Sequence, residues 1–179
     1  APASDIERVI RDYGEDRFAG RIARAICERR KMAPFMRTGE LADFIAATIG
    51  RSHKDAGQHP ATRTFQAIRI FINGELDELS AALAEAGSLL NPDGKLVVIS
   101  FHSLEDRIVK RFFEAGAHPE RAIDARIALK ASDLPEPLWR DVRRIKPTKA
   151  ECEDNPRARS AVMRSAVRTS RAWSDGGAA

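Results

Sequence analysis

The polar residues best suited to chemistry stand where a strongly apolar segment ends. Leu96 to Phe101 is an almost unbroken apolar run rich in β-branched residues, and Ser100, His102 and Ser103 lie at its end. A histidine titrates near neutral pH, which suits a general base, but an imidazole can equally hold a loop by hydrogen bonding. No second histidine, nucleophile elbow or metal-spaced ligand lies nearby, so the sequence favours the second role for His102.

Two basic segments offer places where a phosphate could bind. Arg63 lies near the predicted start of a helix, where backbone N–H groups also attract anions. Residues 155–161 (NPRARSA) and Arg164 place guanidinium groups around a turn. Helix capping explains the first segment equally well, and a solvated turn explains the second.

The charge distribution is more informative than the net charge. The chain has 179 residues, 30 Lys+Arg against 26 Asp+Glu, 43% apolar and 31% charged residues, which is ordinary for a soluble globular protein. Basic side chains crowd the last quarter, a distribution that suits phosphate backbones, although solvation explains any single one. They are Arg140, Arg143, Arg144, Lys146, Lys149, Arg157, Arg159, Arg164, Arg168 and Arg171.

Cysteine usage and hydropathy limit the class of protein. Cys27 and Cys152 are the two cysteines, and neither has the spacing of a metal site or a disulfide framework. No apolar run approaches the roughly 20 residues of a membrane helix. We therefore expect a cytoplasmic protein without a metal site and without a membrane partner.

The elements that must position these residues follow from apolar spacing. Residues 1–50 read as helices joined by short links, and the polar stretch 51–60 predicts a boundary. Further helices are expected over 61–72 and 76–90. Asn91-Pro92-Asp93-Gly94 predicts a turn with its positive φ at Gly94, followed by a strand and by a helix that Ser103 caps with Asp106 as its reciprocal acid.

The apolar run itself predicts the type of sheet. A strand with apolar residues on both sides is typical of a parallel or mixed sheet covered by helices on each face. Further strands are expected over 142–146 and 160–169, the latter with its arginines pointing outward. The fold class is therefore α/β, in which ligands bind at the carboxyl ends of strands.

Three segments in this order resemble one family. They are HPATRTFQAIRIFINGELDEL, LLNPDGKLVVISFHSLEDRIVKRFF and RRIKPTKAECEDNPRARSAVMRSA. They are similar to the bacterial small-subunit ribosomal RNA methyltransferase H family (MraW-like), which uses S-adenosylmethionine to methylate N4 of a decoding-region cytidine. YGEDRFAGRIARAI resembles the helical insert of that family, which helps to recognise substrate.

The resemblance implies a domain organisation and a partner. Residues 1–57 would be the helical insert, 58–173 the C-terminal part of a Rossmann-like S-adenosylmethionine-dependent methyltransferase domain, and 174–179 a flexible tail. The implied partner is small-subunit ribosomal RNA or the small ribosomal subunit; the oligomeric state, including a homo-oligomer, is left open.

The resemblance also assigns roles to residues. Ser100, His102 and Ser103 would form the wall around the substrate base, and the proton acceptor is not assigned. The implied RNA contacts are Arg63, Arg107, Asn155, Arg159 and Arg164. The strand, Gly-rich turn and acids that bind S-adenosylmethionine would precede Ala1, and no GxGxxG or Walker loop is present here.

We therefore expect the C-terminal part of such an enzyme, inactive on its own and without a cofactor site. Two other classes remain: a non-catalytic RNA-binding module, for which the basic last quarter is the evidence, and an inactive remnant of the enzyme.

Overall fold

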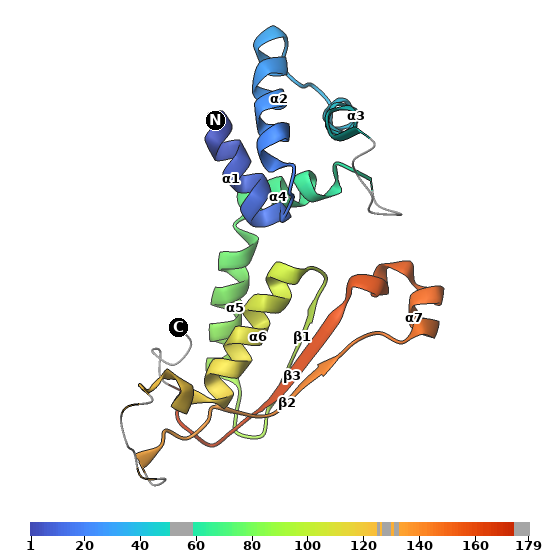
Figure 1. The fold of residues 1–179 in the computed structure, drawn as a ribbon. Coiled ribbons are helices and arrows are strands. Elements are labelled where there is room, and N and C mark those ends of the chain that lie inside the picture. Colours follow the sequence, from blue (N-terminus) through green and yellow to red (C-terminus); the bar gives the residue numbers. More distant parts are fainter. Residues whose placement is uncertain (51–58, 125, 127–129, 131–132, 174–179) are drawn as a thin grey trace. The chain divides into compact units, whose positions relative to one another are not determined.

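The computed structural model describes residues 1–50, 59–124, 126, 130 and 133–173, and these form two compact units, Ala1–Glu75 and Leu76–Ala179 (Figure 1). The first unit is helical. Its helices are α1 (Ala3–Gly14), α2 (Ala19–Met32), α3 (Thr38–Ile49) and α4 (Thr62–Asn73). Their apolar stripes meet in one core around Ile10, Ile22 and Ile45, as the spacing predicts.

The helical unit extends further along the chain than the predicted boundary at residue 57. Helix α4 packs against α1, and Ala61 belongs to the core of the helical unit. The polar stretch 51–58 lies outside the described residues. A polar linker therefore joins two helices of one unit, and the division between the units falls at Glu75, the first residue of helix α5 (Glu75–Leu89).

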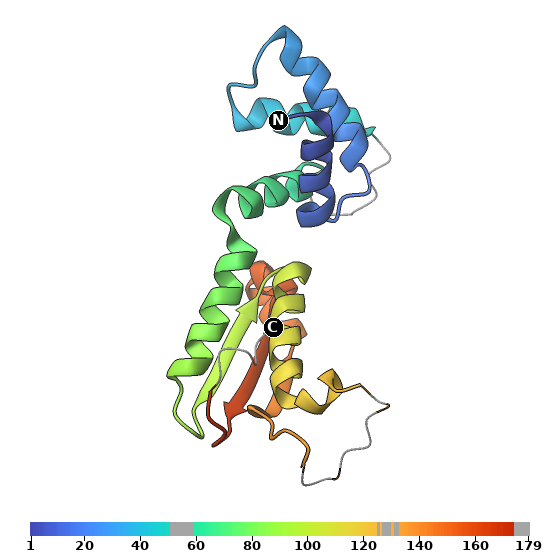
Figure 2. The ribbon, with the colours of Figure 1, turned by 90° about the vertical axis from the view of Figure 1, so that its left-hand side faces the viewer.

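The second unit contains helices and a small sheet (Figure 2). Its elements are α5 (Glu75–Leu89), β1 (Lys95–Ser100), α6 (Ser103–Ala117), the 3-10 turn η2 (Pro119–Ala122), β2 (Trp139–Ile145), α7 (Lys149–Asp154), the 3-10 turn η4 (Pro156–Ser160) and β3 (Val162–Arg168). All three predicted strands are present. Among the described residues, no helix is long and apolar enough to cross a membrane.

The sheet corrects the prediction of a parallel or mixed arrangement with helices on both faces. The described strands have the order β1-β3-β2, and β3 runs antiparallel to both neighbours. Strands β1 and β2 run in the same direction, but β3 returns between them. An apolar run shows that a strand has two apolar faces; it does not show which strand pairs with it.

One face of the sheet is covered by helices α5 and α6. Leu96 and Val98 of β1 and Ala166 of β3 pack with Leu83 of α5 and Val109 of α6. The opposite face carries Val97 and Ile99, which are 48% and 55% exposed. We call these the covered face and the outer face.

The arginines of β3 point toward the covered face, which corrects the expectation that they point outward. Arg164 and Arg168 alternate with Met163, Ser165 and Val167, and both arginines are buried. The side-chain period of a strand is two, so a charged residue on the covered face places its apolar neighbours on the outer one. Partners on the covered face make this orientation stable, as described below.

Aromatic rings fill the covered face. Trp139, which is 1% exposed, contacts Phe112, Phe113 and Trp173 with ring centroids 5.5–6.4 Å apart. Gly116 of α6 allows this approach, because a Cβ there would lie 2.4 Å from Cδ1 of Trp139. Both tryptophans therefore belong to the packing of the protein.

Two irregular positions shape the ends and edge of the sheet. The turn before β1 has its positive φ at Asp93 (67°), not at Gly94, and the Gly94 N–H donates to the carbonyl of Asn91. A β-bulge interrupts β2 between Arg140 and Arg143, where Asp141 has a φ of 54°. The Arg140 guanidinium lies 2.7 Å from Asp93 Oδ1, and hydrogen bonding to that carboxylate raises the pKa of Arg140.

Candidate functional site

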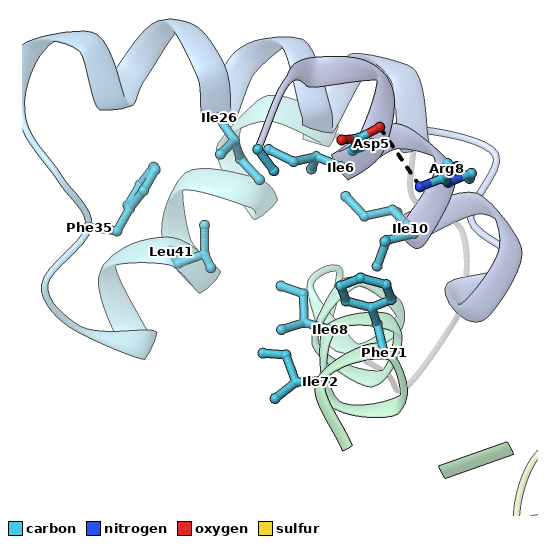
Figure 3. A pocket seen from close by; sticks show the side chains of 12 residues that line it. Asp5, Ile6, Arg8, Ile10, Ile26, Phe35, Leu41, Ile68, Phe71 and Ile72 are labelled. Atoms are coloured by element: carbon cyan, nitrogen blue, oxygen red, sulfur yellow. Dashed lines mark ion pairs between the residues drawn. The ribbon is translucent and has the colours of Figure 1, made fainter. Parts of the chain in front are cut away.

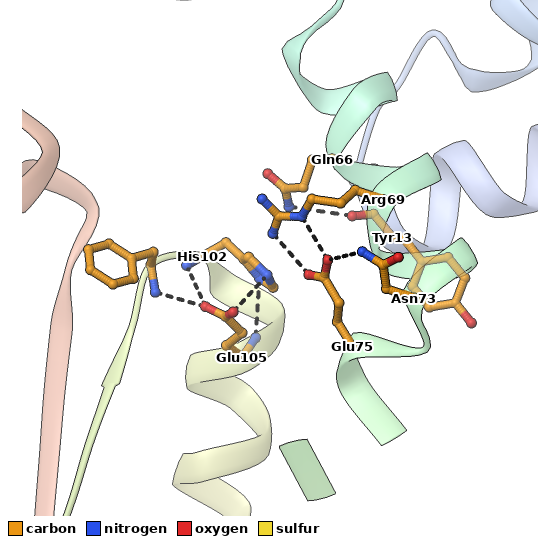
Figure 4. Close-up of polar contacts among 8 residues, drawn as sticks. Tyr13, Gln66, Arg69, Asn73, Glu75, His102 and Glu105 are labelled. Carbon is orange, nitrogen blue, oxygen red and sulfur yellow. Dashed lines mark hydrogen bonds and ion pairs between the residues drawn. The ribbon is translucent and has the colours of Figure 1, made fainter. Parts of the chain in front are cut away.

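The turn between β1 and α6 is held by a single carboxylate (Figure 4). One oxygen of Glu105 accepts the backbone N–H groups of Phe101 (2.8 Å) and His102 (3.2 Å). In return, the Glu105 N–H donates to Nδ1 of His102 at 3.3 Å. This is a reciprocal capping box in which His102 is the N-cap.

The capping box is one residue earlier than the predicted pair of Ser103 and Asp106. A histidine in place of the usual Ser, Thr, Asp or Asn explains the error, because the preferred N-cap residues have short oxygen-bearing side chains. Glu105 is the organising residue that sequence reasoning missed, and its position three residues after His102 was the available signal. Because Glu105 makes the capping contacts, the Asp106 carboxylate can pair with Arg164 instead.

Glu105 hydrogen-bonds to one ring nitrogen of His102 and lies close to the other, which makes no hydrogen bond with it. Nδ1 accepts the backbone N–H, so we assign the ring proton to Nε2, which lies 3.3 Å from Oε1 of Glu105. The side chain is only 11% exposed. This geometry fits a residue that fixes a turn, the role that the sequence favoured.

The three predicted wall residues lie within one turn of each other at the strand end. Ser100 is the last residue of β1 and is 2% exposed on the covered face, where it is paired in register with Val162. Ser103 is exposed in the first turn of α6. The structure therefore brings Ser100, His102 and Ser103 together; their contact with a base stays a prediction.

Arg164 makes a bidentate ion pair with Asp106 of α6. Its Nε lies 2.6 Å and its Nη2 3.1 Å from the two carboxylate oxygens, and Arg164 is only 8% exposed. Hydrogen bonding to Arg164 holds the pKa of Asp106 below its ordinary value, against an opposing effect of burial. A guanidinium used in this way joins helix to sheet and has little surface left for phosphate.

Arg168 is also used inside the protein. It donates to the carbonyls of Thr169 and Arg171 and lies 5.7 Å from the ring centroid of Trp173. Burial lowers its pKa, and the nearby charge of Arg171 acts in the same direction. Two arginines of the basic last quarter thus belong to the core of the sheet unit.

The other predicted RNA contacts lie at the surface or at turns. Arg107 is exposed on α6, and Arg159 is exposed in η4. Asn155 caps η4, because its side chain accepts the Arg157 N–H at 3.1 Å. Arg63 belongs to the helical unit, where its guanidinium donates to the carbonyl of Glu15 at 3.1 Å.

The helical unit has a polar network and a pocket of its own. Glu75 accepts two hydrogen bonds from Arg69 and one from Asn73, while Gln66 donates to the Tyr13 carbonyl (Figure 4). A pocket of about 350 Å³ is lined by apolar side chains, with the Asp5–Arg8 ion pair among its residues (Figure 3).

Two kinds of binding site are absent from the described residues: a Gly-rich turn after β1 and a metal-binding cluster. Strand β1 ends at Ser100 and is followed by Phe101 and His102, without the Gly-rich turn that brings a nucleotide close to a helix N-terminus. No group of three or more His, Cys, Asp or Glu residues in the described part of the chain is arranged to hold a metal ion.

Comparison with known proteins decides the family. The sequence model of the MraW methylase family matches residues 1–169. The chain belongs to the MraW methylase family. Curated members of similar sequence are named ribosomal RNA small subunit methyltransferase H.

The similarity to these MraW methylases extends along the whole chain. The protein of Janthinobacterium sp. (strain Marseille) is 55% identical over 165 residues, covering 92% of this chain and 50% of the relative. Those of Cupriavidus pinatubonensis and Bordetella petrii are 53% and 51% identical, covering all of this chain and 55% and 48% of theirs. The chain thus spans about half the length of the curated relatives it matches.

Proposed function

We propose that this chain is part of an enzyme that transfers the methyl group of S-adenosylmethionine to N4 of a cytidine in the decoding region of small-subunit ribosomal RNA. The observation that carries the proposal is the match to curated ribosomal RNA methyltransferases at 51–55% identity along this chain. The helical unit, Ala1–Glu75, would serve as the helical insert that the sequence placed at residues 1–57, and the second unit as the C-terminal part of a Rossmann-like domain. The substrate would place the protein in the cytoplasm.

The chemistry requires a rigid surface against the target base. The lone pair of a cytosine amine is delocalised into the ring, so the amine is a poor nucleophile and its orientation matters. An enzyme must also take the base out of its stack to reach N4. The strand end formed by Ser100, His102 and Ser103 would provide that surface, with Ser103 exposed on it and Ser100 buried beneath it, because Glu105 fixes the turn that carries them.

RNA binding would use basic residues at the surface, of which Arg63 is partly buried. Arg63, Arg107 and Arg159 would contact phosphates, and Asn155 would hold the turn that presents Arg159. Arg164 would act indirectly, by anchoring β3 to α6 through Asp106. S-adenosylmethionine would be held by residues other than those described in this chain.

Methyl transfer tests the proposal directly. Small ribosomal subunits lacking the modification are incubated with tritiated S-adenosylmethionine and either the 179-residue chain or the natural protein that contains it. We expect label in a cytidine with the natural protein, and neither label nor S-adenosylmethionine binding by calorimetry with the chain alone. Label in another base, or micromolar binding by the monodisperse chain, would contradict the proposal.

A second candidate, a non-catalytic RNA-binding module, is favoured by the exposed basic residues between Arg143 and Arg159. It predicts salt-dependent RNA binding by every form of the protein without methyl transfer by any of them.

A further inference from the structure

A groove lies on the outer face of the sheet, at the carboxyl ends of β1 and β2. Its floor consists of Ile99, Ile145 and Met163, and its sides include Pro147 and Ala161. In the sheet register, Ile99 of β1 and Ile145 of β2 are both paired with Met163 of β3. The floor therefore consists of three residues that lie side by side across the three strands. The volume of about 180 Å³ is below the roughly 300 Å³ at which pockets for drug-sized ligands begin. The groove suits one flat ring system.

The segment that borders the groove is fixed by side-chain caps at two places. The Thr148 hydroxyl accepts the Glu151 N–H at 3.2 Å and begins α7, as the sequence predicted. The Asn155 side chain accepts the Arg157 N–H and begins η4, which leads into Ala161. The groove is therefore built by ordered elements of the described chain.

The charges around the groove favour an anionic partner. Lys146 lines the groove, and the adjoining segments carry exposed Arg143, Arg157 and Arg159. The acids are Glu151, which also lines the groove, Asp154, and Glu153, whose carboxylate lies 3.7 Å from the Lys149 ammonium. An apolar floor with cations at its rim and one carboxylate acceptor matches a base attached to a phosphate backbone.

The groove also lies beside the proposed methylation site. Ile99 and Ser100 are consecutive in β1, so their side chains point to opposite faces of the same strand end. In α/β proteins, ligands bind outside the carboxyl ends of strands. A nucleotide chain passing this end of the sheet can therefore present one base to the turn that carries exposed Ser103 and a neighbouring base to Ile99.

We propose that this groove binds an unpaired RNA base that neighbours the target cytidine. The base lies against the apolar floor and offers an amino or imino N–H to the Glu151 carboxylate, and its phosphate contacts Lys146. Flipped bases are held in this way between apolar side chains and hydrogen-bond partners in other enzymes. This inference rests on the proposed function and adds to it a site that selects the neighbour of the methylated base.

The test measures base-dependent RNA binding by the monodisperse 179-residue chain. Fluorescence anisotropy compares a labelled single-stranded RNA octamer with the same octamer made of abasic nucleotides. Ala161→Leu fills the groove, and Val97→Leu is the matched control on the outer face but outside the groove. We expect Ala161→Leu to weaken binding of the normal octamer at least fivefold and to leave the abasic octamer unchanged, with Val97→Leu neutral for both.

Two further variants test RNA binding by the groove independently of Ala161→Leu. Ala161→Leu could lower the melting temperature, and Ile145→Asp is then used in its place because Ile145 is an exposed residue of an edge strand. Ile145→Asp should weaken binding of the normal octamer in the same way. Lys146→Gln should weaken both octamers and reduce the slope of binding against salt. Equal binding by wild type and both groove variants, or an equal loss for the abasic octamer, overturns the proposal.

Two further results distinguish a base-binding groove from a dimer interface and from the proposed methyl transfer. A wild-type dimer that Ala161→Leu converts to a monomer would assign the groove to a second copy of the chain and overturn the proposal. If base-dependent binding is lost in Ala161→Leu, the groove binds a base. If the natural protein also transfers no methyl group, the proposed function is rejected while the base-binding groove is retained.

Discussion

Each face of the sheet carries some residues that are unusual for their exposure. The covered face buries two arginines and a serine, whereas the outer face exposes valine and isoleucine. Each buried arginine has partners: Asp106 for Arg164, and backbone carbonyls for Arg168. Burial is therefore decided here by available partners as well as by hydrophobicity, and an exposed apolar face beside cations marks a surface for binding.

The largest effect should come from removing the carboxylate under the covered face. Asp106→Ala leaves Arg164 buried and unpaired, so we expect the free energy of unfolding to fall by about 3–5 kcal/mol. Urea denaturation measures this change. The matched control is Glu114→Ala on the same helix, whose carboxylate forms an exposed pair with Lys110 and should contribute at most about 1 kcal/mol. Equal losses would contradict the assigned role.

Acidification should remove the same contribution in wild-type protein. The pKa of Asp106 is lower in the fold than in the unfolded chain, where it is about 3.9, so its stabilisation is complete above that value. It is lost as the pH falls through the folded pKa. Denaturation between pH 6 and pH 2 should therefore show the gap between wild type and Asp106→Ala narrowing toward acid. A constant gap would argue against this linkage.

Packing on the covered face should tolerate no added methyl group at Gly116. A Cβ there would lie 2.4 Å from Cδ1 of Trp139, so we expect Gly116→Ala to cost about 1–3 kcal/mol. The control is Gly39→Ala in α3, which has nothing within 4 Å and should be neutral or stabilising by up to about 1 kcal/mol. Thermal melting distinguishes the two.

The stability of the protein should depend on the His102 cap at the end of β1. His102→Ala removes the acceptor for the Glu105 N–H, and we expect a loss of about 0.5–2 kcal/mol. His102→Asn should retain most of the stability, because asparagine is a preferred N-cap residue. Ser103→Ala, one position later and exposed, is the control. If His102→Asn is as unstable as His102→Ala, capping is not the function of this side chain.

The smallest change in the free energy of unfolding should come from a substitution on the outer face. Val97→Thr should change the free energy of unfolding by no more than about 0.5 kcal/mol, because Val97 is half exposed. Val98→Thr, the next residue but on the covered face, should cost about 1 kcal/mol or more because it places a hydroxyl against the core. Equal costs in urea denaturation would remove the distinction between the faces.

Local signals in the sequence predicted the elements well and their partners poorly. The three strands, the Thr148 cap and the turn at Asn91–Gly94 follow from residues close together in the chain. The antiparallel strand order and the inward direction of Arg164 could not be predicted from nearby residues, because each depends on a segment far away in the chain. Arg164 and its partner Asp106 are 58 positions apart.

The same distinction applies to the candidate site. Ser100, His102 and Ser103 come together because they are near neighbours in sequence. The groove could not be predicted, since its floor combines residues from three strands whose register is set by tertiary structure. Arg164 was a reasonable phosphate contact by composition, and only its burial shows that the charge is already neutralised.

The bulge in β2 gives the two edges of the sheet different capacities for growth. A strand that is bent at Asp141 and lined by Arg143 and Arg144 is a poor template for another backbone, and proteins use bulges and charges to protect edges in this way. In the described part of the chain, β1 pairs only with β3 and has no bulge. Any strand that joins this sheet, from the same polypeptide or another, should therefore add beside β1, so the sheet can be extended from one side only.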